Sequence, residues 1–290
     1  MWIVFACGSA LFAGITAVLA KEGIRTTDST VATALRTIVV LAGAWGMVYI
    51  VGSQAELAHL DARSAGLLVL SGLATGASWL CYFKALQLSS VSKVVPIDKL
   101  STVLTVLLAL IFLGERVSLV GALGVALIAI GTLLMLDADD LRGLPRAVRD
   151  GGGWLLYALG SAFFAALTAI LGKAGITGVE SNLGTAIRTG VVLVMAWVMV
   201  AVTGKLREVR TVPKGELGFV LASGAATCAS WLCYYRALQD GPASVVVPID
   251  KLSVLVTVLF SALVLREAVS RRYLVGLALL VGGTFAMLIR

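Results

Sequence analysis

The chain has 290 residues, of which 59% are hydrophobic and only 13% are charged, whereas roughly a quarter of the residues in soluble domains carry a charge. This composition excludes an ordinary soluble domain and indicates a protein embedded in a lipid bilayer. The net charge of +7 comes mainly from Lys and Arg in predicted loops. Because these residues form no patch interleaved with aromatic side chains, we expect no nucleic-acid partner.

Ten apolar runs follow one another along the chain. Each has roughly 19–24 residues, enough for a helix to cross a hydrocarbon core about 30 Å thick. They cover residues 2–20, 30–50, 65–88, 93–113, 118–136, 154–172, 182–203, 217–238, 243–265 and 272–289. The predicted fold is an all-α polytopic membrane protein with ten transmembrane helices.

The first run is expected to remain as a transmembrane helix. It lacks a basic segment before it and is too long for the apolar part of a signal peptide. The cysteines Cys7, Cys81, Cys228 and Cys233 all lie in apolar segments without a CxxC pair, and the single histidine has no clustered ligands. We therefore expect no disulfide, no metal site and no cofactor.

Charged residues occur inside the second and fourth spans. Arg36 and Asp98 each lie about six residues into their span, roughly 9 Å from the helix end. A carboxylate at that depth needs a partner or water. Neighbours along a helix do not face each other, so we expect Asp98 to pair with Arg36 or Lys84 and not with Lys99.

The third span carries a stripe of polar side chains. Ser71, Thr75, Ser78 and Tyr82 are spaced four, three and four apart, beside Trp79. This spacing puts them on one helix face. The stripe is typical either of close helix packing through small residues or of a cavity wall that binds an organic cargo, and both interpretations stay open.

The fourth span opens with the motif VVPIDKLS, from Val94 to Ser101, and the same letters recur from Val246 to Ser253. Pro96 and Pro248 each remove a backbone donor and disfavour helix at the preceding residue. We expect a broken helix at both prolines, with a free carbonyl beside the aspartate. Within a membrane, broken helices line a cavity or pack on protein.

The whole pattern occurs twice. A shift of 152 positions aligns residues 2–136 with 154–288 without a gap, and roughly 64 of the 135 aligned positions are identical. Each half has five spans, an odd number, so the second half enters the membrane from the opposite side as an inverted repeat. We expect two five-helix repeats, 1–136 and 154–290, joined by a linker at 137–153, and a monomer suffices because both repeats lie in one chain.

The second half therefore repeats the candidate site. The equivalent residues are Arg188, Ser223, Thr227, Ser230, Trp231, Tyr234, Asp250 and Lys251. The charged members among them, with Arg236, are expected to form a second charged cluster near the opposite membrane face: Arg188, Arg236, Asp250 and Lys251. These clusters are either structural ion pairs or groups that gate and bind cargo. The excess of Lys and Arg on one side predicts a cytoplasmic linker, with both termini outside.

Motifs of catalysis and ATP hydrolysis are missing from the sequence, including GxxxxGK[ST], HExxH and GxSxG. We therefore expect no enzymatic activity. A transporter of this kind would use an ion gradient or let its cargo run downhill.

The sequence resembles the EamA-like branch of the drug/metabolite transporter superfamily. The resemblance rests on "ALFAGITAVLAKEGI" in the first span, "SWLCYFKALQ" closing the third, and an early proline in the fourth followed by "FLGERVS". The motif VVPIDKLS is most similar to short five-span members that work as pairs. The resemblance implies a central cavity lined mainly by spans 1, 3, 4, 6, 8 and 9, alternating access, and often export of amino acids or related metabolites.

One departure bears on the alternatives. Small multidrug exporters of this superfamily rely on a glutamate inside the first span. Here, spans 1 and 6 contain no Asp or Glu before Lys21 and Lys173. Asp98 and Asp250 are the acids left to carry protons, although pairing with Arg would make them poor carriers. A proton-coupled multidrug or cation antiporter stays an alternative, as does a membrane interaction protein that transports nothing.

The interpretation we favour is a secondary transporter in a bacterial-type cytoplasmic membrane. It would export small organic metabolites that are amino-acid-like or otherwise zwitterionic, with protons as a candidate coupling ion. The gate or cargo-binding groups would be Asp98, Lys99, Asp250 and Lys251, supported by Arg36 and Arg188.

Overall fold

The computed structural model describes residues 1–88, 94, 97–135, 153–263 and 270–289, with side chains as far as 260 in the third of these longer ranges. All regular secondary structure in these residues is helical. The first half contains α1 (Trp2–Gly23), α2 (Ser29–Val51), η1 (Ser53–His59), α3 (Ala62–Leu88), α5 (Ser101–Phe112) and α6 (Leu119–Leu134). The second contains α8 (Gly153–Gly175), α9 (Ser181–Val202), η2 (Lys205–Thr211), α10 (Lys214–Asp240), α11 (Ala243–Lys251), α12 (Ser253–Leu263) and α13 (Arg271–Ala286). The predicted linker lies outside the described residues except for Gly153.

The helices have the length and composition of membrane spans. In the described ranges, seven helical stretches are long and apolar enough to cross a bilayer, among them Ala243–Phe260, which joins α11 to α12, and α6 is a shorter apolar helix. The five spans predicted for each half correspond to α1, α2, α3, the segment ending in α5, and α6, and then to α8, α9, α10, α11 with α12, and α13. The predicted fold class, an all-α membrane protein built from two inverted repeats, is confirmed, and the described helices account in whole or in part for the five spans predicted in each half.

Hydrogen bonds between loops show the inversion of the second half. Lys205, after α9, donates to Asp28, before α2, at 2.5 Å, which joins the first loop of one half to the second loop of the other. At the opposite end, the backbone N–H of Glu180, between α8 and α9, donates to Glu56 in η1 at 3.1 Å. Equivalent loops of the two halves therefore lie at opposite ends of the bundle.

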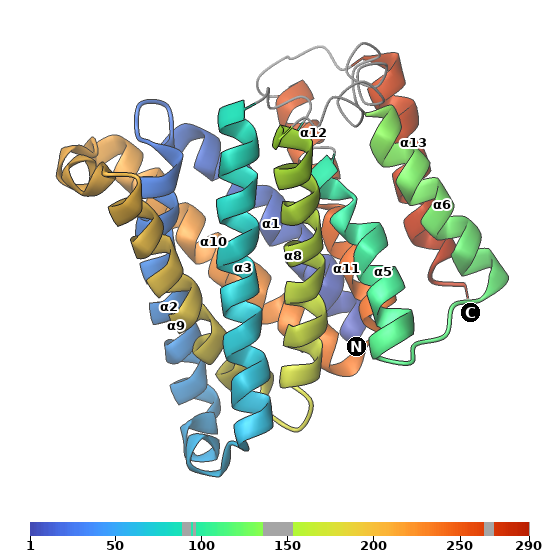
Figure 1. Cartoon of the computed structure of the whole chain (residues 1–290), viewed down its shortest axis with the longest axis horizontal. Coiled ribbons are helices and arrows are strands. Elements are labelled where there is room, and N and C mark those ends of the chain that lie inside the picture. Colours follow the sequence, from blue (N-terminus) through green and yellow to red (C-terminus); the bar gives the residue numbers. More distant parts are fainter. Residues whose placement is uncertain (89–93, 95–96, 136–152, 264–269, 290) are drawn as a thin grey trace.

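The helices of one half pack against helices of the other. In Figure 1, α2 and α9 lie at one side, α6 and α13 at the other, and α1, α3, α8 and α10 lie between them. The contact between α6 and α13 is built from glycine. A β-carbon added to Gly131 would lie 2.5 Å from the Gly276 carbonyl oxygen, and one added to Gly124 would lie 2.6 Å from that of Gly283. The two backbones therefore touch, as is common between membrane helices.

The ninth span is broken, but not at the predicted residue. α11 runs through Pro248 and ends at Lys251, and Val247 before the proline remains helical. Pro248 removes one helical hydrogen bond without stopping the helix. The break comes at Leu252, whose N–H bonds the Ile249 carbonyl at 2.9 Å in a tightened turn before α12 begins. In the first half, Leu100 bonds the Ile97 carbonyl in the same way, and Pro96 lies outside the described residues.

Candidate functional site

A cavity of about 230 Å³ lies between the two halves, lined by residues of α1, α3, α8, α9, α10 and α11. The family resemblance implied spans 1, 3, 4, 6, 8 and 9. The structure adds α9, which contributes one side chain, whereas no described residue of the fourth span lines the cavity. Of the residues predicted from the sequence, the cavity brings together Ser78, Trp79, Arg188, Ser230, Trp231, Tyr234, Asp250 and Lys251.

Each aspartate of the repeated motif is held by a serine from the other half. The Ser161 hydroxyl donates to Asp98 Oδ1 at 2.6 Å, and the Ser9 hydroxyl donates to Asp250 Oδ1 at 2.5 Å. Ser9 and Ser161 are equivalent in the repeat, as are the two aspartates. The two hydrogen bonds are therefore one interaction made twice, and each joins the two repeats.

The polar stripe of α3 and α10 supports these serines. Ser78 donates to the Ser161 carbonyl oxygen at 3.1 Å, and Ser230 donates to that of Ser9 at the same distance. Nearer the beginning of α3, Ser71 donates to the Thr168 carbonyl oxygen at 2.8 Å. The stripe therefore serves helix packing, and its members Ser78 and Ser230 also line the cavity. Helix packing is therefore observed for the stripe, and a cavity wall is observed for two of its members, while the binding of a cargo there stays a prediction.

Arg188 is almost completely buried, with 2% of its surface exposed. Its Nη2 donates to Thr75 Oγ1 at 2.7 Å and its Nε to Ser71 Oγ at 3.4 Å. The guanidinium carbon lies 4.9 Å from the centre of the Trp231 ring and 4.7 Å from that of Tyr235. Hydrogen bonds and two aromatic faces thus stabilise this cation inside the bundle.

The predicted partner of Asp98 is wrong. Arg36 is half-buried and donates to Thr33 Oγ1 within its own helix, at 3.3 Å, while Asp98 accepts from Ser161. Equal depth in the membrane does not make neighbours: α2 packs on α9 and α10, whereas Ser161 places Asp98 beside α8. Arg36 is also absent from the residues that line the cavity.

The other predicted basic partners lie at helix ends. Lys84 is exposed and donates to Gln87 one turn further along α3. Arg236 forms an exposed ion pair with Asp240, 3.3 Å from Nε to Oδ2. Both side chains therefore make local contacts in place of a bond to an aspartate of the repeated motif.

Two further predicted residues, Tyr82 and Lys99, do not line the central cavity. Tyr82 packs in an apolar cluster with Leu86 and Leu100 and makes an edge contact with Phe83, 5.7 Å between ring centres. Lys99 lines a smaller cavity, to which Lys251 also belongs.

The sequence analysis missed Ser9, Ser161, Thr168 and Tyr235. A signal existed for the serines, because the letters GSA recur at 8–10 and 160–162 inside two apolar spans. Tyr235 has Phe83 as its equivalent, so the repeat gave no indication of a polar ring there. Within the described part of the chain, no group of three or more His, Cys, Asp or Glu residues is arranged to hold a metal ion.

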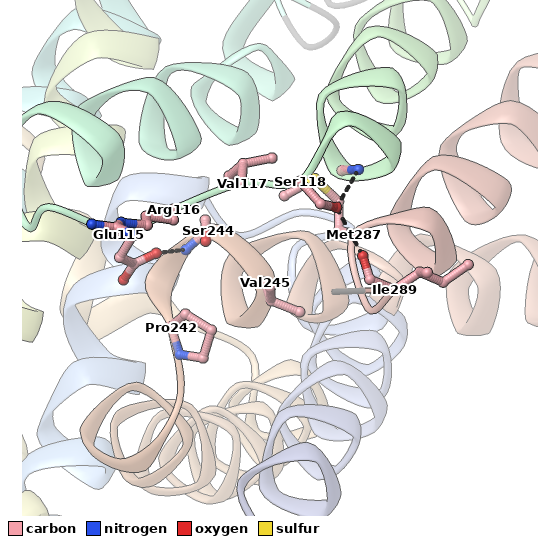
Figure 2. Close-up of a pocket in the computed structure, with 10 residues that line it drawn as sticks. Glu115, Arg116, Val117, Ser118, Pro242, Ser244, Val245, Met287 and Ile289 are labelled. Atoms are coloured by element: carbon pink, nitrogen blue, oxygen red, sulfur yellow. Dashed lines mark hydrogen bonds between the residues drawn. The ribbon is translucent and has the colours of Figure 1, made fainter.

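A larger cavity, of about 540 Å³, lies at the end of the bundle where α11 begins. Figure 2 shows Glu115 pointing to the first turn of α11, where its carboxylate accepts from the N–H groups of Ala243 at 2.7 Å and Ser244 at 2.9 Å. Beside it, Ser118 donates to the Ile289 carbonyl oxygen at 3.0 Å. Glu115 therefore caps the helix that carries Asp250 and Lys251.

Known proteins share both the repeat and the fold. The profile of the EamA-like transporter family matches residues 1–137 and again 152–289. A relative from Sinorhizobium sp., named as an uncharacterized transporter in the cobO 3′ region, is 45% identical over 134 residues, which are 46% of this chain and 95% of the relative. A crystal structure of another protein shares the fold, with a TM-score of 0.72 at 19% identity, over 98% of this chain and 94% of the other. The chain belongs to the EamA-like transporter family and is a polytopic membrane transporter.

Proposed function

We propose that the protein is a secondary transporter that exports small zwitterionic or amino-acid-like metabolites across a bacterial-type cytoplasmic membrane. The observation that carries the proposal is the cavity of about 230 Å³, which presents the Asp250 carboxylate and the Lys251 ammonium beside the rings of Trp79, Trp231 and Tyr234. Opposite charges that line one cavity, next to aromatic side chains, match a molecule with an ammonium, a carboxylate and an apolar body.

The charges are available to a cargo. From the described residues, the Asp250 carboxylate receives one hydrogen bond, from Ser9, and an ionised carboxylate has about four lone-pair positions. Lys251 has no hydrogen bond or ion pair with any residue in the described ranges. The volume lies below the roughly 300–1,000 Å³ of sites for drug-sized ligands, which favours a metabolite over a multidrug cargo.

The two arginines support alternating access. Arg188 and Arg36 each lie seven residues after the start of their helix, but inversion of the repeat puts them toward opposite faces. Arg188 is bonded to Thr75 and enclosed by aromatic rings, whereas the Arg36 side chain bonds only Thr33 among the residues that the structure describes. We infer that the Arg188 side is closed here and that Arg36 takes up the equivalent bond, to Thr227, in the opposite state.

Protons fit as the coupling ion. Neither Asp98 nor Asp250 has a cation within ion-pair distance among the described residues, and each carboxylate instead accepts from a serine hydroxyl. An arginine partner would have kept them ionised. Addition of a protonophore to energised vesicles is therefore expected to stop uphill export. Export that continues unchanged would exclude coupling to protons.

The proposed function is tested by comparing metabolites in the medium and the cytosol of cells that express matched variants. Asp98→Asn/Asp250→Asn removes both half-buried acids of the motif, and Asp240→Asn is the control, since Asp240 is an exposed acid at the end of α10. At equal membrane abundance, a zwitterionic compound should appear in the medium with the wild type and the control but not with the double variant. If wild type and double variant shift the same compounds equally, the aspartates are structural. If the wild type shifts none, the export proposal fails.

The arginine exchange makes a separate prediction. Arg36→Gln and Arg188→Gln should both abolish export, because each cation is used in one state. Arg188→Gln should also lower the melting temperature more than Arg36→Gln, since Arg188 makes more contacts in this state. Normal export by Arg36→Gln would refute the exchange.

A further inference from the structure

A second cavity, of about 90 Å³, separates the main bundle from the α6 and α13 pair. Lys99 comes from the end of the first-half motif and Lys251 from the same position in the second. Equivalent residues can line one cavity only where the two halves meet near the axis that relates them. Lys251 also lines the central cavity, so the two spaces share a wall.

The two ammonium groups have no partners among the described residues. Neither donates a hydrogen bond or lies within ion-pair distance of a carboxylate there. The nearby acids Asp98 and Asp250 attract Lys99, but Lys251 repels it. Two like charges within the membrane, here on two different spans, are unfavourable because the low-dielectric surroundings penalise each cation and strengthen their repulsion.

The other walls of this cavity are suited to an anion. Thr102 and Thr132 present hydroxyls and Tyr273 presents a phenol, while the remaining residues are apolar and none carries a carboxylate. Hydroxyls donate to oxyanions, and a bound oxyanion would offset the charge of both lysines at once.

We propose that Lys99 and Lys251 together form a binding site for a small oxyanion, a carboxylate or phosphate group, shared by the two repeats. The link to cargo rests on the proposed function: because Lys251 faces both cavities, the acid group of a cargo can reach the site from the central cavity. A free anion from solution would use the same chemistry. The anion site itself does not depend on export.

The test is isothermal titration of the purified full-length protein in detergent with inorganic phosphate and with acetate. Lys99→Gln and Lys251→Gln each remove one site cation. Lys84→Gln is the matched control, because it removes an exposed lysine of α3 that lies outside the cavity. Lys99→Arg keeps the charge. We expect the affinity to fall at least tenfold in each site variant and to stay unchanged in Lys84→Gln and within a few fold in Lys99→Arg.

Millimolar phosphate and acetate that fail to bind the wild type would overturn the site, as would equal affinity in Lys99→Gln and the wild type. Should the glutamine variants not fold, the melting temperature of the wild type decides. Phosphate must raise it more than a bulky sulfonate of equal ionic strength, and an equal effect refutes the site. In transport vesicles, acetate that raises the KM for the exported compound identifies the cargo's acid group as the occupant, and an unchanged KM identifies a free anion. A wild type that binds neither anion but still shows aspartate-dependent export refutes this site and leaves the proposed function standing.

Discussion

Substitution of Glu115 tests how the beginning of α11 is held in place. Its carboxylate accepts hydrogen bonds from the backbone N–H groups of Ala243 and Ser244 in the first turn of α11, at 2.7 and 2.9 Å. Those groups have no acceptor within the helix. Glu115→Ala removes both bonds and the negative charge at the positive end of the helix dipole, and Glu115→Gln keeps one acceptor oxygen without the charge.

The size of the effect follows from the position of the cap. Hydrogen bonds to charged groups contribute about 1.5–3 kcal/mol each when they are buried. Here the carboxylate borders an open cavity, so water replaces part of the loss and the range for helix caps applies, about 0.5–2 kcal/mol. The dipole adds about 0.3–1 kcal/mol. We therefore expect Glu115→Ala to lower the free energy of unfolding by about 2 kcal/mol, and Glu115→Gln by about 1 kcal/mol.

Reversible unfolding in mixed detergent measures this difference. Glu208→Ala in η2 is the control, because Glu208 is exposed and its carboxylate has no hydrogen bond with any residue that the structure describes. If Glu115→Ala is no less stable than Glu208→Ala, Glu115 does not hold α11. Export should fall in the same order as stability, since Asp250 and Lys251 lie at the other end of this short helix.

Two further predictions concern the packing of α6 on α13 and the loops. Gly131→Ala places a β-carbon 2.5 Å from the Gly276 carbonyl oxygen, so it should lower the free energy of unfolding by about 1–3 kcal/mol as the helices separate. Gly282→Ala is the control, because its β-carbon would have nothing within 4 Å, and it should be neutral or slightly stabilising. Equal melting temperatures of the two variants would contradict this. Burial raises the pKa of Asp28, but hydrogen bonds from Lys205 and from backbone N–H groups of α2 outweigh burial and hold it below the usual 3.8. A lowered carboxyl pKa stabilises the fold above that value, so this contribution, at most about 1 kcal/mol, should disappear as the pH falls from about 5 through the folded pKa, and Asp28→Asn should flatten that part of the curve of melting temperature against pH.

The number of spans and their inversion could be predicted from the sequence, because both depend on features that lie along the chain. Apolar length sets the spans, and identity at a fixed shift of 152 residues reveals the repeat. The partner of Asp98 could not be predicted. Depth in the membrane restricts the choice to residues at one level, but only the packing of helices decides between Arg36 on α2 and Ser161 on α8.

The site was predicted where composition departed from an apolar background. Asp250, Lys251 and Arg188 are charges in membrane spans, and all three line the central cavity. Ser9 was missed because serine is common in membrane helices, and its role depends on a hydrogen bond across 241 positions. The break at Leu252 depends on how α11 meets α12, which the preference of the residue before Pro248 does not determine.

The two halves also separate effects of sequence from effects of state. At the contact of α3 with α9, Gly76 faces Met195, whereas the equivalent contact of α10 with α2 has Cys228 facing Gly43. This difference is one of amino-acid sequence, so it must persist in every conformational state.

The arginines differ in another way. Two side chains that contact Arg188, Thr75 and Trp231, have identical equivalents in Thr227 and Trp79, whereas the equivalent of Tyr235 is Phe83. The Arg36 side chain nevertheless makes no hydrogen bond to Thr227 and no contact with the Trp79 ring in this structure. The proposed alternating-access mechanism predicts that equivalent residues have unequal surroundings in any one state, because the two halves would exchange conformations when the site opens to the other face. By the same reasoning, contacts made equally in both halves, such as the bonds of Ser9 and Ser161 to their aspartates, should survive the exchange. A Ser9→Ala variant should therefore impair both directions of transport, whereas Arg188→Gln should first destabilise the state in which that arginine is enclosed.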